Sequence, residues 1–424
     1  MMLAKRWSAV FTGLFLLIVL SGCSFISDPK SLMQTPQLTS DKASLISVIK
    51  SELKGGEIIS PRDVRNNSSI RTPDLNNDGV KEAVVFYQTP DEAVRIHGMI
   101  LEREGDTWAL KARFDGEGQV LETFDILDLN GDGNLEIIAG FSRGGDGDEQ
   151  QKGLTVYSYN AGNVEKLMAL PYDYFMVDDL NQDGQPDITV VSLKREQFAT
   201  VTTYQYADGS FQQLSQLELD DPVSEYYNAV SGNITPKLKG VILDASVGTH
   251  SAFSTIIVMK DGQLVNLLPS QDMTLKGYPI LSGDVNNDGV LEVGMLEKPK
   301  GWEYISFDDI PWLVTYYQWD EKDGLKSVMQ QYMDMAGRFY FNFPKEWRGN
   351  VTIDTKSDKN EHLWFIKTDT NEVVAEIRFF TPSEWEKNKA DWQYLARERD
   401  TARVIGFLSH TDLKVNKGET EIKR

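Results

Sequence analysis

The sequence predicts a mainly β protein, and three observations lead to that fold class. First, an Asp/Asn/Gly-rich nonapeptide recurs four times, beginning at Asp74, Asp128, Asp179 and Asp284. Second, a strand-like apolar run follows every copy, and further short runs separated by turn residues fill the interval to the next copy. Third, the copies start about 52 residues apart, with one interval twice that length. Repeats of this size, each with several short strands, are typical of the blades of a β-propeller.

We therefore expect a propeller of about five to six blades over residues 57–335. The doubled interval predicts a blade that has lost its nonapeptide near Ser231, where an apolar run at 241–243 lies in the expected place. The expected strands are 82–87, 95–102 and 108–113 in blade one; 120–127, 137–141, 154–159 and 164–170 in blade two; 174–177, 188–192, 200–206 and 211–217 in blade three; 226–230, 241–243, 253–259 and 264–268 in blade four; and 278–281, 293–296, 312–319 and 325–332 in blade five.

The nonapeptide has the donor pattern of a site for a hard cation. Oxygen-bearing side chains occupy positions 1, 3, 5 and 9, Gly at position 6 permits a sharp turn, and position 7 offers its backbone carbonyl. Oxygen-only ligands favour calcium, with up to four ions in the chain. The candidate metal ligands are Asp74, Asn76, Asp78, Val80 and Glu82; Asp128, Asn130, Asp132, Asn134 and Glu136; Asp179, Asn181, Asp183, Gln185 and Asp187; and Asp284, Asn286, Asp288, Val290 and Glu292.

Two other interpretations of the nonapeptide were weighed. An EF-hand requires a bidentate Glu at position 12 and flanking helices, but position 12 is Val85, Ala139, Val190 or Met295, each inside an apolar run. A metal-free turn remains the alternative, because Asp, Asn and Gly favour turns without any ion. Four copies that keep the same donor type at every metal position favour the ion site.

These loops resemble the FG-GAP/VCBS-type repeats of integrin-α-like β-propellers, whose blades carry a DxDxDGxxD calcium loop between two strands. The resemblance covers roughly residues 60–335. This chain departs from the pattern in having Asn at position 3 and Glu at position 9 of three copies, and it lacks clear FG-GAP tripeptides. The resemblance implies a calcium-stabilised propeller and does not imply an integrin-like ligand site.

The N-terminal 22 residues have the features of an export signal. Lys5 and Arg6 are followed by an apolar stretch of about twelve residues, which is too short for a stable membrane helix. The sequence from Leu20 to Cys23 resembles the lipobox of bacterial lipoproteins, in which the Cys becomes the lipidated N-terminus. An ordinary secretory signal with an incidental Cys is the alternative. More than one acyl chain, such as palmitate, on Cys23 would anchor the protein at the outer face of the cell membrane.

A tether and one amphipathic helix are expected over residues 23–56. The helix is predicted at 41–54, where Leu45, Ile46, Ile49 and Leu53 share a face and Gly55 follows the end. This segment, followed by a blade, resembles the N-terminus of lipoproteins of Gram-positive bacteria that contain FG-GAP repeats. That resemblance implies no particular activity.

A small α+β domain with a charged tail is predicted for residues 336–424. Strands are expected at 339–343, 351–354, 363–367, 373–380 and 404–408. Thr381, Pro382 and Glu384 form a capping box with Pro at the first helical position, which predicts a helix from there to about residue 399.

No motif in the chain predicts catalysis. Ser142 lies in a G-x-S-x-G sequence after a strand, but a nucleophile elbow also requires a helix directly afterwards, and Gly145 to Glu149 follow instead. His97, His250, His362 and His410 have no metal-ligand spacing, and the acidic stretch at 146–149 is expected to be a solvated loop. The aromatic residues between Trp302 and Trp319 are expected to be core, with a sugar- or protein-binding surface as the alternative.

The formal net charge of −21 opposes nucleic acids and anionic glycopolymers as general partners. The expected function is therefore that of a membrane-anchored, extracellular, non-enzymatic binding or assembly module with a protein or carbohydrate ligand. The alternative is a propeller-type hydrolase or lyase acting on extracellular carbohydrate or cell-wall material.

Overall fold

The computed structural model describes residues 40–63, 67–89, 94–143, 151–194, 198–219, 223–268, 270–322 and 324–413. The predicted signal sequence, Cys23 and the tether up to residue 39 lie outside the described residues, as do the acidic stretch at 146–149 and the tail from residue 414.

The described chain is mainly β, and its strands form six antiparallel sheets that we number along the chain. Alternating apolar side chains and short turns generate four-stranded units, as the sequence predicts. Sheet one comprises β1 (Glu57–Ile58), β3 (Glu82–Gln88), β4 (Ile96–Glu104) and β5 (Thr107–Asp115), and β2 (Ile70–Arg71) also pairs with β3; sheet two comprises β6 (Val120–Leu127), β7 (Glu136–Ser142), β8 (Lys152–Asn160) and β9 (Asn163–Tyr172). Sheet three comprises β10 (Tyr174–Asp178), β11 (Asp187–Lys194), β12 (Phe198–Ala207) and β13 (Ser210–Leu219), and sheet four comprises β14 (Glu225–Thr235), β15 (Leu238–Gly248), β16 (Ser251–Lys260) and β17 (Gln263–Asn266). Sheet five comprises β18 (Val293–Glu297), β19 (Leu313–Trp319), β20 (Leu325–Met333) and β21 (Tyr340–Asn342), and sheet six comprises β22 (Val351–Ile353), β23 (His362–Lys367), β24 (Val373–Phe380), β26 (Val404–Ser409) and β25 (Gln393–Arg397).

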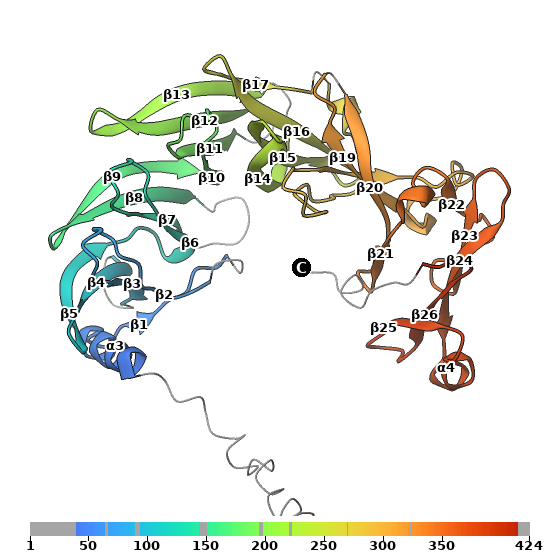
Figure 1. Ribbon diagram of the computed structural model, residues 1–424, viewed down its shortest axis with the longest axis horizontal. Helices are drawn as coiled ribbons and strands as arrows, with labels where there is room; N and C mark the ends of the chain where they lie inside the picture. Colours follow the sequence, from blue (N-terminus) through green and yellow to red (C-terminus); the bar gives the residue numbers. More distant parts are fainter. Residues whose placement is uncertain are drawn as a thin grey trace, which may run out of the picture.

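The sheets follow one another around an arc in chain order (Figure 1). In sheets two to four, β6, β10 and β14 lie nearest the centre of the view, and β9, β13 and β17 lie at the outside. Buried side chains fill the spaces between neighbouring sheets: Phe86 of sheet one meets Phe124 of sheet two edge-to-face, with ring centroids 5.0 Å apart. This arrangement is consistent with a propeller-like fold.

Sheet four has a tight hairpin where sheets two and three have the nonapeptide. Its first two strands run directly from Thr235 to Leu238, and these two residues pair in register. The loop predicted to be missing near Ser231 is therefore replaced by two turn residues at the end of β14.

The C-terminal region differs from the prediction in two elements. The helix α4 (Pro382–Asn388) has the predicted capping box, but it ends eleven residues before the predicted end, and Gln393–Arg397 forms β25 instead. Pairing with β26 decides the conformation of this segment, so the helix expected through Trp392 and Leu395 was wrong. β21, which falls inside the range expected for the C-terminal domain, pairs with β20 and completes sheet five.

Sheets five and six share a continuous apolar core. Tyr332 and Phe341 from sheet five both pack edge-on against Phe365 of sheet six. The strand predicted at 278–281 is absent from the described residues, where that segment makes loop structure between β17 and β18. Three short 3-10 helices complete the described elements: Gln271–Met273, Phe307–Asp309 and Lys345–Trp347.

The N-terminal helix α3 (Ser40–Glu52) covers the outer strand of sheet one. Its buried residues Leu45 and Ile49 pack with Trp108 of β5, while Arg113 of β5 donates to Glu52 near the helix end. Neither of the two α-helices in the described residues combines the length and the apolar character needed to cross a bilayer.

Candidate metal loops

Each nonapeptide lies immediately before one strand of its sheet, which is the inner strand β3, β7 or β11 in sheets one to three and the first strand, β18, in sheet five. The position 9 acid is the first residue of β3, β7 and β11, and it directly precedes β18 in the fourth copy. The four candidate loops therefore occupy equivalent places in sheets one, two, three and five.

The four loops share one backbone shape. Position 6 is a glycine in the left-handed region every time, with φ between 84° and 94°. Position 4 also has positive φ in every copy: Asn77 (54°), Gly131 (73°), Gln182 (61°) and Asn287 (59°). The same nonapeptide thus adopts the same backbone shape in all four sheets.

Backbone amides hold the position 1 carboxylate in place. In the fourth loop, Oδ1 of Asp284 accepts from the backbone N–H of Asp288 at 3.1 Å, and Oδ2 accepts from that of Gly289 at 3.0 Å. The first and third loops repeat both bonds. In every loop the Asn at position 3 donates its amide to the Asp at position 5. The donor side chains thus converge within a single turn.

The position 9 acids are buried, and two of them have an unpaired oxygen. Each accepts the backbone N–H of position 2, at 2.6–2.9 Å. Oε1 of Glu82 and Oδ1 of Asp187, however, are buried without any hydrogen-bond partner. A buried carboxylate oxygen without a partner is costly, so these two atoms are suited to accept a proton or a cation.

Burial, reinforced by the charges at positions 5 and 1, raises the pKa of Glu82, Glu136 and Glu292 to about 7 and that of Asp187 to about 6. In the fourth loop, one carboxylate oxygen from each of Asp284, Asp288 and Glu292 lies within 4.8 Å of the other two. Among the described residues, this is the one trio of acidic, His or Cys side chains that meets this distance. The residues fit a hard divalent cation, because the donors are all oxygen and the crowded negative charges lack a counter-ion.

Neighbouring loops contact one another directly. The N–H of Leu135 in the second loop donates to the carbonyl of Leu75 in the first, at 2.8 Å. The amide of Gln185 in the third loop donates to the carbonyl of Leu129 in the second, at 3.0 Å. The hairpin of sheet four continues the chain of contacts, because Asn233 accepts from the N–H of Leu291 in the fourth loop.

Two glutamines that the sequence patterns did not single out also reach the loops. Gln205 of β12 donates to Asp183 at 2.8 Å, and Gln318 of β19 donates to both Asp288 and Glu292, at 2.9 and 2.7 Å. Only the strand register reveals them, since Gln318 lies opposite the position 9 acid across β18 and β19.

The other residues considered from the sequence are Ser142, the aromatic residues between Trp302 and Trp319, and the histidines. Ser142 is the last residue of β7, donates to Glu122, and is followed among the described elements by a strand rather than a helix. Trp302, Trp312 and Tyr316 are buried, as expected for core, whereas Tyr304 is 99% exposed. Of the histidines, His362 and His410 both contact Glu376 at 2.7 Å, a convergence that their sequence spacing does not reveal.

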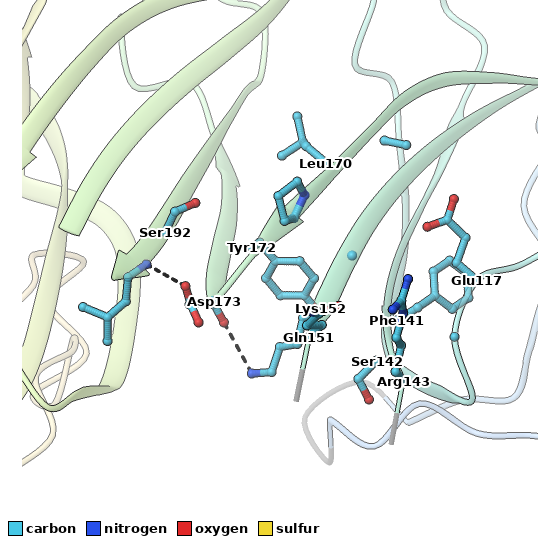
Figure 2. A pocket seen from close by; sticks show the side chains of 15 residues that line it. Glu117, Phe141, Ser142, Arg143, Gln151, Lys152, Leu170, Tyr172, Asp173 and Ser192 are labelled. Atoms are coloured by element: carbon cyan, nitrogen blue, oxygen red, sulfur yellow. Dashed lines mark hydrogen bonds between the residues drawn. The ribbon is translucent and has the colours of Figure 1, made fainter. Parts of the chain in front are cut away.

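A cavity of about 670 Å³ lies between sheets two and three, at the strand ends opposite the loops (Figure 2). Lys152 donates to the carbonyl of Asp173 at 3.4 Å, and its ammonium lies over the rings of Tyr172 and Tyr174. The Asp173 carboxylate accepts the N–H of Leu193 at 2.6 Å, and Glu117 is paired with Lys166. The lining therefore combines aromatic surface with charged groups that are already engaged.

No family model matches the chain, and no curated protein matches it. Among solved structures, the chain is similar to rhamnogalacturonan lyase PL11 of Bacillus licheniformis (12% identity, 84% of this chain and 72% of that chain covered, TM-score 0.34). It is also similar to the exotype rhamnogalacturonan lyase YesX (12% identity, 84% and 75% covered, TM-score 0.26) and to Saccharomyces cerevisiae Sqt1 (10% identity, 78% and 93% covered, TM-score 0.31). Similarity at this level carries no argument about function.

Proposed function

We propose that the protein is a lipid-anchored binding module on the outer face of a bacterial cell membrane, with a β-propeller of five to six blades stabilised by calcium. One observation carries the calcium part of this proposal. Four loops in different sheets hold the same oxygen donors in the same backbone shape, and two of their buried carboxylates have an oxygen without a partner. A metal-free turn would leave those oxygens with no compensation.

The ions would be held by the side chains at positions 1, 3, 5 and 9 and by the carbonyl at position 7. Gln205 and Gln318 would hold the ligating carboxylates of two loops in position by donating hydrogen bonds to Asp183 and Glu292. Extracellular modules bind calcium with dissociation constants of roughly 0.1–1 mM, so these loops suit an ion-rich exterior. An ion at ten times its Kd stabilises the native state by about 1.4 kcal/mol per site.

The membrane location rests on the sequence around Cys23 alone. Lipidation there would tether the body through residues 24–39, leaving the sheets outside the membrane. Expression of a Cys23→Ser variant tests this part, because we expect the variant to appear in the culture medium while the native sequence stays with the membrane fraction.

The cavity in Figure 2 supports ligand binding more than carbohydrate hydrolysis or elimination. An acid–base pair needs free carboxyl groups, but Asp173 accepts a backbone N–H and Glu117 is paired with Lys166. Lys152 instead offers a hydrogen-bond donor to a protein or sugar ligand, because it uses only one of its three ammonium protons on the carbonyl of Asp173.

Metal analysis and thermal unfolding together test the calcium proposal. We expect about four calcium ions per purified chain, and a melting temperature that falls in excess chelator and recovers with calcium but not with magnesium. Asp284→Asn should remove one ion, whereas Asp208→Asn, at a turn between β12 and β13 that has no other donors, should remove none. A chain free of metal, with the same melting temperature in chelator, would refute the proposal.

A further inference from the structure

A hydroxyl, an imidazole and a carboxylate form a hydrogen-bonded row at one end of sheet one. Oγ1 of Thr89, the residue after β3, lies 2.9 Å from Nε2 of His97. Nδ1 of His97 lies 2.9 Å from Oδ1 of Asp115. In the tautomer with the proton on Nδ1, the imidazole donates to Asp115 and accepts from the Thr89 hydroxyl, whose other acceptor, the carbonyl of Val94, is more distant at 3.5 Å. This is the order of groups that activates a hydroxyl as a nucleophile.

The pairing of β3, β4 and β5 brings these three side chains together. Tyr87, His97 and Asp115 are direct cross-strand neighbours on β3, β4 and β5, and Thr89 follows Tyr87 by two residues on the same face. The His97 ring stacks on Tyr87 with centroids 5.3 Å apart, which limits its rotation.

The repeated sheets provide an internal comparison for the row. Counting from the position 9 acid, the places of Thr89, His97 and Asp115 are taken by Arg143, Gly153 and Pro171 in sheet two. They are taken by Lys194, Thr200 and Glu218 in sheet three, and by Pro299, Leu313 and Tyr332 in sheet five. The fold therefore forms without a hydroxyl–imidazole–carboxylate row at this place, so its presence in sheet one is not a requirement of the architecture.

The row borders a cavity of about 370 Å³ between sheet one and the C-terminal end of α3. Thr89, His97 and Asp115 line one side, and Lys54 and Arg113 line the same cavity. Arg113 is engaged by the Tyr87 hydroxyl and by Glu52, whereas Lys54 has no hydrogen-bond or ion-pair partner among the described residues. A cation that lines the same cavity as a nucleophile can reach a developing oxyanion and stabilise it.

We propose that Thr89, His97 and Asp115 form an acyl-transfer site that hydrolyses small O-acyl esters, an activity beyond the proposed binding function. The Thr89 oxygen attacks the ester carbonyl while its proton passes to Nε2 of His97, and Lys54 faces the resulting oxyanion. Collapse breaks the bond to the alcohol, which takes the proton from His97 and leaves an acyl-threonine. Water then attacks the acyl group, gives a proton to His97, and releases the carboxylic acid with Thr89 restored.

Asp115 is a positioning residue in this scheme, because it acts through the imidazole. Its exposed side chain (70% accessible) accepts the proton on Nδ1 and so fixes the tautomer in which Nε2 can take up a proton. The cavity of about 370 Å³ has room for a small ester such as an acetate.

Hydrolysis of p-nitrophenyl acetate by the full chain, together with labelling by a fluorophosphonate, tests the proposal. We expect the label on Thr89, located by peptide mass, and a fall in kcat of at least about 100-fold in Thr89→Val and His97→Gln. Thr200→Val is the matched control, since Thr200 holds the place of His97 in sheet three, and it should leave the rate unchanged. Asp115→Asn should lower kcat with little change in KM and move the pH–rate profile to lower pH, and Asp115→Glu should restore part of the rate.

Labelling of the native chain shows whether Thr89 is the nucleophile even if a variant fails to fold. Absence of label from Thr89, or equal hydrolysis by the native chain and a Thr89→Val variant with an unchanged melting temperature, would overturn the proposal. The calcium experiment above is independent, so the activity and the proposed metal loops fail or succeed separately.

Discussion

Nζ of Lys276 lies 3.2 Å from Oδ1 of Asp244, and both side chains are completely shielded from solvent. The ammonium also donates to Oγ of Ser254 and to the carbonyls of Ile280 and Gly294, at 2.8–2.9 Å. Because Asp244 belongs to β15 and Gly294 to β18, this cation joins sheets four and five. Among sheets one to five as described, sheet four is the one without a candidate metal loop. The Lys276 ammonium, surrounded by four oxygens, lies buried where sheet four meets sheet five.

Replacing Lys276 should destabilise the protein severely. Burial lowers the pKa of Lys276, and removal of its charge would leave the buried Asp244 carboxylate with hydrogen bonds from Ser254 and Ser282 but without its counter-ion. We expect Lys276→Met to lower the free energy of unfolding by about 3–5 kcal/mol in a urea titration. Lys276→Met with Asp244→Leu should recover part of that loss, and Lys326→Met, at an exposed lysine, should cost less than about 0.5 kcal/mol. A loss below about 1 kcal/mol in the single variant would contradict the role assigned to this pair.

Glu82, the position 9 acid of the first loop, should lower the melting temperature when no metal is bound and raise it when calcium is bound. Glu82 is buried close to Asp74 and Asp78, so its charge is unfavourable unless an ion is bound. We expect Glu82→Gln to raise the melting temperature slightly in excess chelator and to reduce the gain that calcium gives. Calorimetry in both conditions measures this, and Glu104→Gln at an exposed end of β4 is the control. The prediction fails if the variant responds to calcium as the native chain does.

Gln318 should raise the calcium affinity of the fourth loop by holding two of that loop's carboxylates in position. Its amide donates to Asp288 and Glu292, and loss of such a second-shell contact typically reduces metal affinity about 10–100-fold. We expect Gln318→Leu to weaken one calcium site by that factor in isothermal titration and to leave the remaining sites unchanged. Gln213→Leu, at an exposed position on β13, should leave every site unchanged.

Glu398 should make the stability of sheet six decrease at acidic pH. Its hydrogen bonds from Arg403 and Arg338, at 2.8 and 2.6 Å, hold its pKa at about 2, below the ordinary value of 4.5. A carboxyl whose pKa is lower in the folded state contributes stability that is present above pH 4.5 and lost as the pH falls towards 2. We expect Glu398→Gln to reduce stability near neutral pH by up to about 3 kcal/mol and to flatten the decline between pH 4.5 and 2.

The exposed Glu372 provides the control for Glu398. It is paired with Lys367 at the surface, so Glu372→Gln should keep the native acid profile. Unfolding by urea at several pH values, followed by tryptophan fluorescence, gives both profiles. Identical profiles for Glu398→Gln and the native chain would exclude a contribution from Glu398.

Gly98 should tolerate no side chain. A Cβ at this position of β4 would lie 2.1 Å from Cζ of Phe114, which packs against Phe86 and Tyr157. We expect Gly98→Ala to lower the free energy of unfolding by about 1–3 kcal/mol, because the ring must move out of a filled core. Gly248→Ala is the matched control, since nothing lies within 4 Å of its added methyl group.

Local patterns in the sequence predicted most strands, because alternation and turn chemistry act over a few residues. β6 has the predicted bounds, and the missing loop of sheet four falls where the repeat spacing places it. Prediction failed where distant pairing decides the conformation, as in Gln393–Arg397, which becomes a strand only because β26 lies beside it. The candidate loops were predictable because their donors are consecutive. Lys276 with Asp244, and Thr89 with His97 and Asp115, have no local signal and come together only through strand register.

The position of the loops gives the molecule an electrical asymmetry. Each nonapeptide places three carboxylates at one end of its strands, and Lys81 is the one basic residue within the four copies. At the opposite ends the charges are closer to balance, because Lys54, Lys152 and Lys194 lie near Asp115, Glu117 and Asp173. Strands of seven or eight residues separate these two rims by about 25 Å. Near any negatively charged surface, the resulting dipole moment would turn the acidic rim away and present the rim with the lysines and cavities. Divalent ions in the loops would weaken that torque, so the preferred orientation of the molecule would depend on its ionic surroundings.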